Sequence, residues 1–192
     1  TAHCDMSASS KAQSSRSVPP PTDRPVRLLL AGVWDLFHHG HARAMKSAKL
    51  LFPSTTLVIG IHSDPTVLKY KGKVVFQYEE RKSILEHIKW VDEILDDTPW
   101  FPTLDWMATH KIDYVVGDEN VYDQYEGAPF MPVREAGRFI SMPREEGIST
   151  ASILTRVVRN YDAYINQILD KGKSMKELNV SYLKGMELAA KR

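Results

Sequence analysis

The chain has 192 residues, 43% of them apolar, and a formal net charge of +1 at pH 7. This length suits one domain of ordinary size, or one domain with tails, and the apolar content is enough for a buried core. A charge so near zero excludes a global attraction to nucleic acid, so any anion site must be local. The longest apolar runs, such as 57–61, are far shorter than the roughly 20 residues of a membrane-spanning helix.

The N-terminal residues 1–23 are rich in serine, alanine and proline, with three consecutive prolines at 19–21. Such a segment buries too little apolar surface to offset the entropy of ordering, so we expect a disordered tail. Cys4 is the single cysteine, which excludes an internal disulfide and fits a reducing compartment. Because no signal-like segment follows Thr1, we expect part of a longer, cytoplasmic protein.

From residue 24 onward, short apolar runs alternate with segments of helical spacing. The run 26–31 is apolar except for Arg27 and predicts a buried strand, and apolar residues then recur at helical spacing at 44, 45, 48 and 51. The next predicted elements are a strand at 56–61, a helix within 78–95 that runs into a strand at 93–95, and a helix and strand within 104–118. They are followed by a short helix beginning at Pro132, a strand at 139–142, a helix at 149–169 with Ser149 as N-cap, and a final helix at 174–192.

This alternation predicts an α/β fold, an open parallel sheet of the Rossmann-like type with helices on both faces. In such sheets ligands bind beyond the carboxyl ends of the strands, so we expect the ligand site there. We divide the chain into the tail, a catalytic domain at 24–170 and a C-terminal helical extension at 171–192.

The stretch "HHGH", residues 38–41, lies where the first strand passes into the first helix. His38 and His41 are three apart, so their side chains can share one face of the helix. A helix N-terminus carries partial positive charge and unpaired N–H groups that suit a phosphate, and Gly40 lets an anion approach the backbone. Two imidazoles there could stabilise the charge of a phosphoryl-type transition state. The alternative is a pair of surface or half-buried histidines without a chemical role.

A second candidate anion site is "REEGISTAS", residues 144–152. Arg144 offers a guanidinium, Gly147 a turn, and Ser149 and Thr150 open the long predicted helix. The alternative is an ordinary capped helix with a solvated arginine. No residues with metal-ligand spacing stand out.

The two motifs together, His38–His41 and Arg144-x-x-Gly147-Ile148-Ser149-Thr150, resemble those of the cytidylyltransferase family. The connecting segments are similar to the catalytic domain of the eukaryotic CTP:phosphocholine cytidylyltransferases. These segments are "RPVR" (24–27), "SAKLLFP" (47–53), "KGKVV" (71–75), "WVDEI" (90–94), "PW" (99–100), "KIDYVVGD" (111–118) and "KELNVSYL" (176–183). The resemblance covers about residues 24–183.

The resemblance implies direct attack of an alcohol's phosphate on the α-phosphate of CTP, with release of pyrophosphate and with Mg²⁺ bound through the CTP phosphates. His38 and His41 would hold the triphosphate, Lys71 would bridge the two reacting phosphates, and Arg144 would hold the β- and γ-phosphates. A solvated loop lysine is the alternative at Lys71. The implied nucleotide site comprises Val33, Trp34, Gly40, His41, Lys71, Gly117, Asp118, Tyr122, Arg144, Glu145, Glu146, Gly147, Ile148, Ser149 and Thr150.

The implied acceptor site comprises Ala31, Lys71, Trp100, Tyr122 and Phe130, and here the chain departs from its relatives. They have Asp-Gly where this chain has Ala31-Gly32, His-Asp-Asp where it has 117–119, and tyrosine where it has Phe130. A quaternary ammonium is usually held by aromatic faces and a carboxylate. Trp100 and Tyr122 keep two aromatic walls, although Trp100 could instead merely cover a core. The Gly-Asp pair at 117–118 is similar to the glycerol-3-phosphate branch, and Glu145 replaces the threonine of the family pattern.

The leading prediction is therefore transfer of CMP from CTP to a phosphorylated small alcohol, phosphocholine first. The alternatives are the same transfer to glycerol 3-phosphate or phosphoethanolamine, and a nucleotide-binding scaffold of low activity. The resemblance also implies a homodimer that uses 24–27. Relatives carry a membrane-binding segment after the catalytic domain, but 174–192 lacks its long basic and apolar pattern, so we expect no membrane contact from this piece. A nuclear or membrane-associated location stays open for the full-length protein.

Overall fold

The structure is a computed structural model that describes residues 18–118, 130–143 and 147–181. The chain divides into two compact units, Thr1–Ile148 and Ser149–Arg192, and each is described here by itself. The predicted tail lies outside the described residues up to residue 17. Its end is attached to the first unit, because the Tyr114 hydroxyl donates a hydrogen bond to the Val18 carbonyl at 2.6 Å.

The first unit is built on a five-stranded sheet in the order β3-β2-β1-β4-β5, with every neighbouring pair parallel. The strands are β1 Val26–Gly32, β2 Thr55–Ile61, β3 Glu93–Leu95, β4 Tyr114–Gly117 and β5 Phe139–Ser141. The predicted α/β fold with an open parallel sheet is therefore confirmed. Because β1 and β4 are neighbours that are not consecutive in the chain, the strand order reverses beside β1, where open sheets bind ligands.

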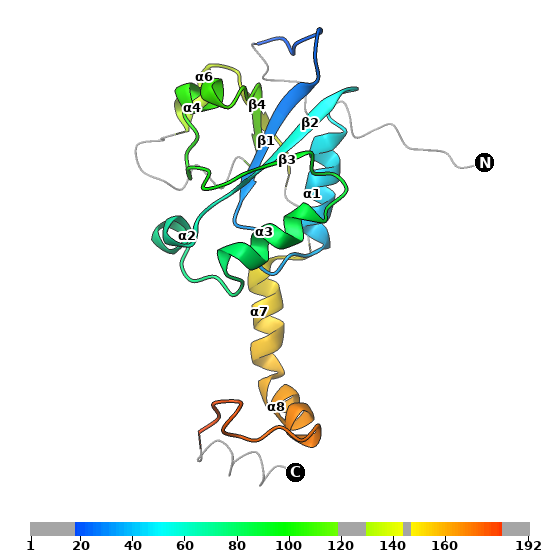
Figure 1. The fold of residues 1–192 in the computed structure, drawn as a ribbon, viewed down its shortest axis with the longest axis vertical. Coiled ribbons are helices and arrows are strands. Elements are labelled where there is room, and N and C mark those ends of the chain that lie inside the picture. The colour runs from blue at the N-terminus through cyan, green and yellow to red at the C-terminus, as the bar shows by residue number, and fades with distance from the viewer. Residues whose placement is uncertain (1–17, 119–129, 144–146, 182–192) are drawn as a thin grey trace, which may run out of the picture. The chain divides into compact units, whose positions relative to one another are not determined.

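Helices cover both faces of this sheet (Figure 1). They are α1 His39–Lys49, α2 Asp64–Tyr70, α3 Tyr78–Glu86, α4 Leu104–Thr109 and α6 Met131–Glu135. Leu28 and Leu30 pack with side chains of α1 and α3, whereas Leu29 packs with side chains of α4 and α6. The alternation of side chains along β1 therefore produces two cores, one on each face of the sheet.

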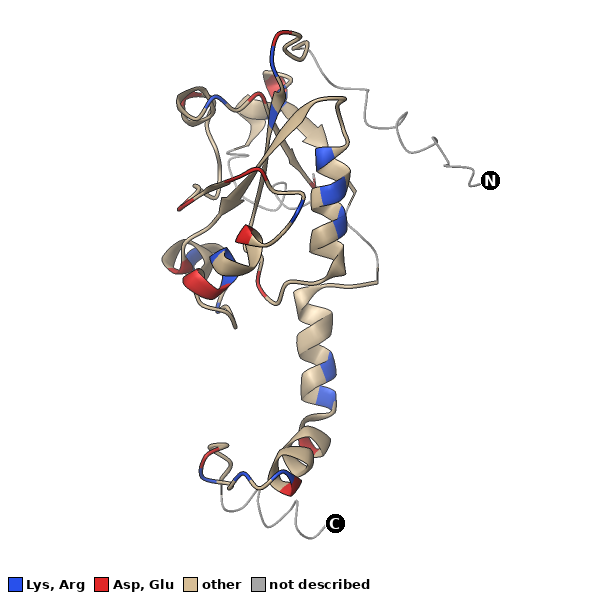
Figure 2. Ribbon diagram, turned by 45° about the vertical axis from the view of Figure 1, so that its right-hand side comes forward, with Lys and Arg blue, Asp and Glu red and all other residues tan. Residues whose placement is uncertain are grey.

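The strands and most helices agree with the sequence prediction, and the differences have local causes. We did not predict α2, which begins with an acidic residue and a proline and has Ser63 as its N-cap. The helix predicted within 78–95 ends at Glu86, and turns at 87–92 lead into β3. In α1 the basic residues lie outside, as the spacing predicts (Figure 2), and Lys49 forms an ion pair with Asp92.

The second unit begins with α7, Thr150–Arg159, followed by α8, Tyr161–Asp170. Ser149 is the N-cap of α7, as predicted, and its hydroxyl accepts the Ser152 N–H at 3.0 Å. The helix predicted at 149–169 is interrupted at Asn160, which separates α7 from α8. In the structure α7 belongs to the second unit, and the domain boundary at 170 stays a prediction. Of the helix predicted at 174–192, the described part, 174–181, forms turns.

Candidate active site

The predicted histidine motif lies at the turn from β1 into α1, at the carboxyl end of the central strand. His38 is the N-cap of α1 in extended conformation, and the helix begins at His39. The rings of His38 and His41 are stacked, with centroids 3.8 Å apart and 17° between their planes. A Cβ at Gly40 would lie 3.0 Å from the His38 ring and 3.0 Å from Ile148, so only glycine admits both neighbours without a shift. The two imidazoles are thus brought together at a helix N-terminus.

The turn before the motif has an unusual backbone. Trp34 and Leu36 are in the left-handed region, at φ 61° and 45°, which costs conformational energy for residues with a Cβ. The Trp34 ring Nε1 donates to the Gly60 carbonyl at 2.9 Å, and the ring meets His41 edge-on at 5.3 Å. The predicted nucleotide contacts Val33 and Trp34 have buried side chains. Any contact of these two residues with a nucleotide would therefore come from their backbone.

Asp35, which the sequence analysis did not identify, connects this turn to the segment after α2. Its buried carboxylate accepts the backbone N–H groups of Val75 and Phe76, both at 2.9 Å. It also accepts the N–H of Leu36 at 3.0 Å. One carboxylate therefore fixes the loop that follows Lys71 against the turn that carries the histidines. The signal available in the sequence was an acidic residue between apolar ones, Trp34 and Leu36, and it does not identify the partners of Asp35.

Lys71 is the C-cap of α2 and is exposed. Its backbone N–H donates to the Val67 carbonyl at 2.8 Å, and Gly72 follows with φ 110°, a conformation that favours glycine. The helix therefore ends at the lysine, and the chain turns back toward Asp35. The structure leaves an ammonium on a flexible stem between a helix end and a fixed loop.

Arg81 of α3 is the second residue that the sequence analysis missed, and it is fully buried. Its guanidinium donates to the Val33 carbonyl at 2.5 Å, to the His62 carbonyl at 2.9 Å and to the Asp64 carboxylate at 2.6 Å. The two carbonyls belong to the residues that directly follow β1 and β2, and the carboxylate begins α2. A charge that is wholly removed from water is retained when it is paired and hydrogen-bonded, as it is here.

Ala31 of the predicted acceptor site lies on the face of the sheet that α4 and α6 cover. In the strand register Ala31 pairs with Gly60, and Gly117 follows the Leu29–Val115 pair by two residues, so the three small residues form one row. Next to this row Trp100 is buried and stacks on Tyr70, with ring centroids 5.2 Å apart. Small residues therefore end the central strands beside an aromatic side chain.

Phe130 occupies a different environment. It is 2% exposed and packs edge-on against Phe139, with ring centroids 5.2 Å apart. Its side chain belongs to the core that Leu29 and Val133 also form. The structure therefore assigns the Phe130 side chain to packing, and substrate contact by this residue stays a prediction.

Several predicted site residues lie outside the described residues, namely Tyr122, Arg144, Glu145 and Glu146. Gly147 is described and has φ 83°, which agrees with the predicted turn. Ile148 ends the first unit, whereas Ser149 and Thr150 begin the second. Asp118 follows β4 directly.

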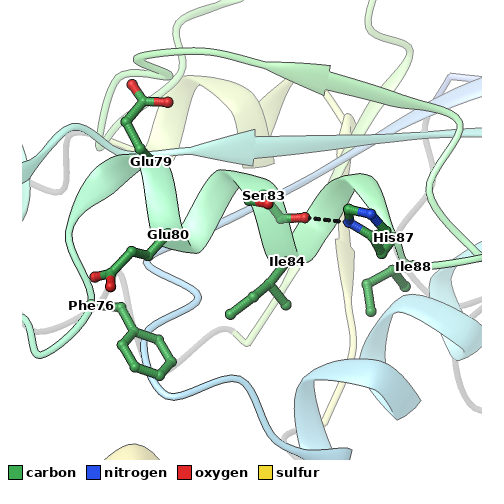
Figure 3. A pocket seen from close by; sticks show the side chains of 7 residues that line it. All are labelled: Phe76, Glu79, Glu80, Ser83, Ile84, His87 and Ile88. Carbon is green, nitrogen blue, oxygen red and sulfur yellow. Dashed lines mark hydrogen bonds between the residues drawn. The ribbon is translucent and has the colours of Figure 1, made fainter.

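A groove beside α3 is a separate feature of the first unit (Figure 3). Phe76, Ile84 and Ile88 point to the same side and form its apolar part. Its polar lining is Glu79, Glu80, Ser83 and His87, and His87 is hydrogen-bonded to the Ser83 carbonyl at 2.7 Å. Two carboxylates without lysine or arginine do not suit a triphosphate, so we place the anion site at the histidines.

An open parallel sheet with a strand-order reversal and two stacked histidines at the adjoining helix N-terminus is typical of a nucleotide-binding protein. A sequence model of the cytidylyltransferase-like family matches residues 29–156. The chain belongs to this family.

Curated relatives agree with this assignment. The chain is 43% identical over 170 residues to a probable choline-phosphate cytidylyltransferase of Schizosaccharomyces pombe, covering 88% of this chain and 47% of the relative. It is 43% identical to the human choline-phosphate cytidylyltransferase A, covering 85% of this chain and 45% of that protein. It is 32% identical to the mouse ethanolamine-phosphate cytidylyltransferase, covering 72% and 34%. The chain thus spans about half the length of the choline-phosphate relatives, or less.

Among solved structures, the fold is similar to the lipopolysaccharide core biosynthesis protein of Thermoplasma volcanium. The TM-score is 0.50 at 20% identity, covering 63% of this chain and 98% of the other. This likeness supports the fold alone. In the part of the chain that the structure describes, no helix has the length and apolarity needed to cross a membrane.

Proposed function

We propose that the chain transfers CMP from CTP to a phosphorylated small alcohol, with phosphocholine as the leading acceptor. The single observation that carries the proposal is the stacked pair of His38 and His41 at the N-terminus of α1, directly after the central strand. The names of the relatives at 43% identity support phosphocholine.

In the proposed reaction a phosphate oxygen of the acceptor forms a bond to the α-phosphorus of CTP. The bond from that phosphorus to the oxygen bridging the β-phosphate breaks, and pyrophosphate leaves with the electron pair. His38 and His41 donate hydrogen bonds to the triphosphate and stabilise the charge that develops on it. Lys71 draws the two repelling anions together with its flexible ammonium, and Arg144 holds the leaving phosphates.

Mg²⁺ is part of the proposal as an ion carried by CTP. Among the described residues no group of three or more histidine, cysteine, aspartate or glutamate side chains could hold a metal ion. Mg²⁺ is commonly bound by one or two carboxylates together with substrate phosphates. In the proposal the CTP phosphates hold the ion, where it would neutralise part of their charge.

The acceptor is the part of the proposal with two alternatives. The relative named for ethanolamine phosphate supports phosphoethanolamine, and the Gly-Asp pair at 117–118 supports glycerol 3-phosphate. A scaffold of low activity is the third alternative. Turnover separates it from the enzyme, because a scaffold binds CTP without forming product.

We further propose that the catalytic unit is a homodimer. Residues 24–27 are the predicted shared surface, and within one chain both of their arginines are engaged. Arg24 binds the Asp113 carboxylate through two nitrogens, each at 2.7 Å, and Arg27 pairs with Glu93 at 2.9 Å. These pairs keep the arginines ordered at the start of β1, and sedimentation at micromolar concentration would test the association.

The decisive experiment incubates the protein with CTP and each acceptor separately, namely phosphocholine, phosphoethanolamine and glycerol 3-phosphate. We expect equal amounts of pyrophosphate and of the CDP-alcohol, the acceptor joined to CMP through its phosphate. The highest kcat/KM is expected for phosphocholine. Lys71→Ala should lower transfer to every acceptor alike, because the ammonium serves the phosphates. CTP binding without product from any acceptor would support the scaffold and refute the proposal.

A further inference from the structure

A group of four side chains at the carboxyl end of β2 contains a histidine that the proposed chemistry does not use. This aromatic cluster consists of His62, Tyr70, Trp100 and Phe101. The His62 ring lies 4.8 Å from the Trp100 ring, centroid to centroid, and the Tyr70 ring stacks on Trp100 with centroids 5.2 Å apart. Phe101 meets Tyr70 edge-on at 5.5 Å and packs against the cores on both sides of it.

The cluster is next to the row of small residues that ends the central strands. The N–H of His62 donates to the Gly32 carbonyl at 3.3 Å, a bond that belongs to the last pair of the register, Gly32 with Ile61. His62 directly follows the last residue of β2 and is two residues beyond Gly60, which pairs with Ala31. Side chains two residues apart on a strand share a face, which puts His62 on the face that carries Ala31.

The hydrogen bonds of His62 determine which ring nitrogen can accept. Nδ1 lies 2.7 Å from the Thr98 carbonyl, and a carbonyl only accepts, so Nδ1 carries the proton. Burial lowers the pKa of His62 below its ordinary value, the Thr98 carbonyl opposes this in part, and Arg81 and Lys71 lower the pKa further. Nε2 of the neutral ring is then an acceptor. It bonds to no described residue and is not fully buried.

We propose that His62 is a specificity-determining residue of the acceptor site. Its Nε2 accepts a hydrogen bond from a phosphorylated amino alcohol whose nitrogen retains an N–H, while the adjacent Trp100 ring contacts the same cation. This proposal rests on the proposed function, since it assumes that the acceptor's head group lies at Trp100. Ala31 stands near the end of β1 where the relatives have a carboxylate. In this chain the neutral imidazole of His62 would therefore accept the hydrogen bond beside the Trp100 ring. A quaternary ammonium has no N–H and gains nothing from it.

The test compares four acceptors that carry the same positive charge but differ in N–H groups. They are phosphoethanolamine, its N-methyl and N,N-dimethyl derivatives, and phosphocholine. The key variant is His62→Asn, because an asparagine amide nitrogen stands at the place of Nδ1 and can still donate to Thr98 while Nε2 is lost. His62→Gln places an amide group near Nε2 and should restore part of the effect.

We expect the ratio of kcat/KM for the dimethyl acceptor to that for phosphocholine to fall about tenfold in His62→Asn, the effect of one hydrogen bond from a charged donor. The KM for CTP should stay within about twofold, and His87→Asn, an exposed histidine of the α3 groove, should change nothing. An unchanged ratio, or an equal loss with all four acceptors, would overturn the inference and leave the proposed function standing. Absence of product from every acceptor with the unmodified chain would overturn both.

Discussion

The hydrogen bonds from Val75 and Phe76 to the Asp35 carboxylate allow a quantitative prediction. Each hydrogen bond from an N–H to a carboxylate contributes about 1.5–3 kcal/mol. The N–H groups of Val75 and Phe76 can be hydrated once they are released, because both side chains are at least partly exposed, so the lower value applies. Asp35→Ala removes both bonds and should cost about 3 kcal/mol of loop positioning, or on the order of a hundredfold in kcat/KM. Asp35→Asn keeps one acceptor oxygen and should cost about tenfold.

Steady-state transfer assays with saturating CTP would measure these losses, and Glu79→Gln, an exposed acidic residue of α3, is the matched control. If Asp35 acts by positioning Lys71, its loss should matter little once the lysine is absent. We therefore expect the double variant Asp35→Ala, Lys71→Ala to be no slower than Lys71→Ala alone. Independent, additive losses would refute the reasoning, as would Asp35→Ala with more than about a third of the original kcat/KM.

Three other predictions follow from the described geometry. His38→Ala or His41→Ala should each reduce transfer by about a hundredfold to a thousandfold without unfolding the chain, and activity above about a tenth would contradict the assignment. Gly40→Ala should reduce transfer by displacing the His38 ring. Alanine itself stabilises the helix by up to about 1 kcal/mol relative to glycine. Thermal unfolding measures the effect on stability, and kinetics measure the effect on transfer. Burial raises the pKa of Asp113, but hydrogen bonds from Arg24 and from the Arg27 backbone N–H outweigh it and hold this pKa below its ordinary value. Arg24→Ala should therefore lower the free energy of unfolding by about 0.5–1 kcal/mol at neutral pH, and the difference should vanish as the pH falls through the pKa of Asp113 in the folded chain; a difference that grows in acid would contradict it.

The sequence predicted the sheet because its strands are short apolar runs buried on both faces. Periodicity was sufficient for β1 and β2, where almost every residue is apolar. It failed for α2, whose seven residues are too few to show a pattern, and at Asn160, where apolar spacing continues although the helix is interrupted. Helix ends depend on local turns that hydrophobic spacing does not encode.

The sequence predicted the part of the site whose residues are close together in the chain. His38, Gly40 and His41 form a compact motif, and the structure brings the two rings together as the spacing indicated. Asp35 and Arg81 act through backbone groups far away in the chain, so no local pattern could identify their partners. Phe130 shows the opposite case, since an aromatic residue at an expected pocket position packs in a core.

The hydrogen bonds of Arg81 have a consequence for which substitutions this protein can accept in evolution. Its guanidinium joins the ends of β1 and β2 to the start of α2, while Asp35 attaches the following loop. The residues that end the strands at Ala31 and Gly117 take no part in these bonds through their side chains. Substitutions at those two positions therefore leave intact the bonds that fix the turn with the histidines and the loop after Lys71. In the proposed acceptor site, a change of alcohol would then need substitutions at strand ends only, while the residues proposed to bind phosphate stay unchanged.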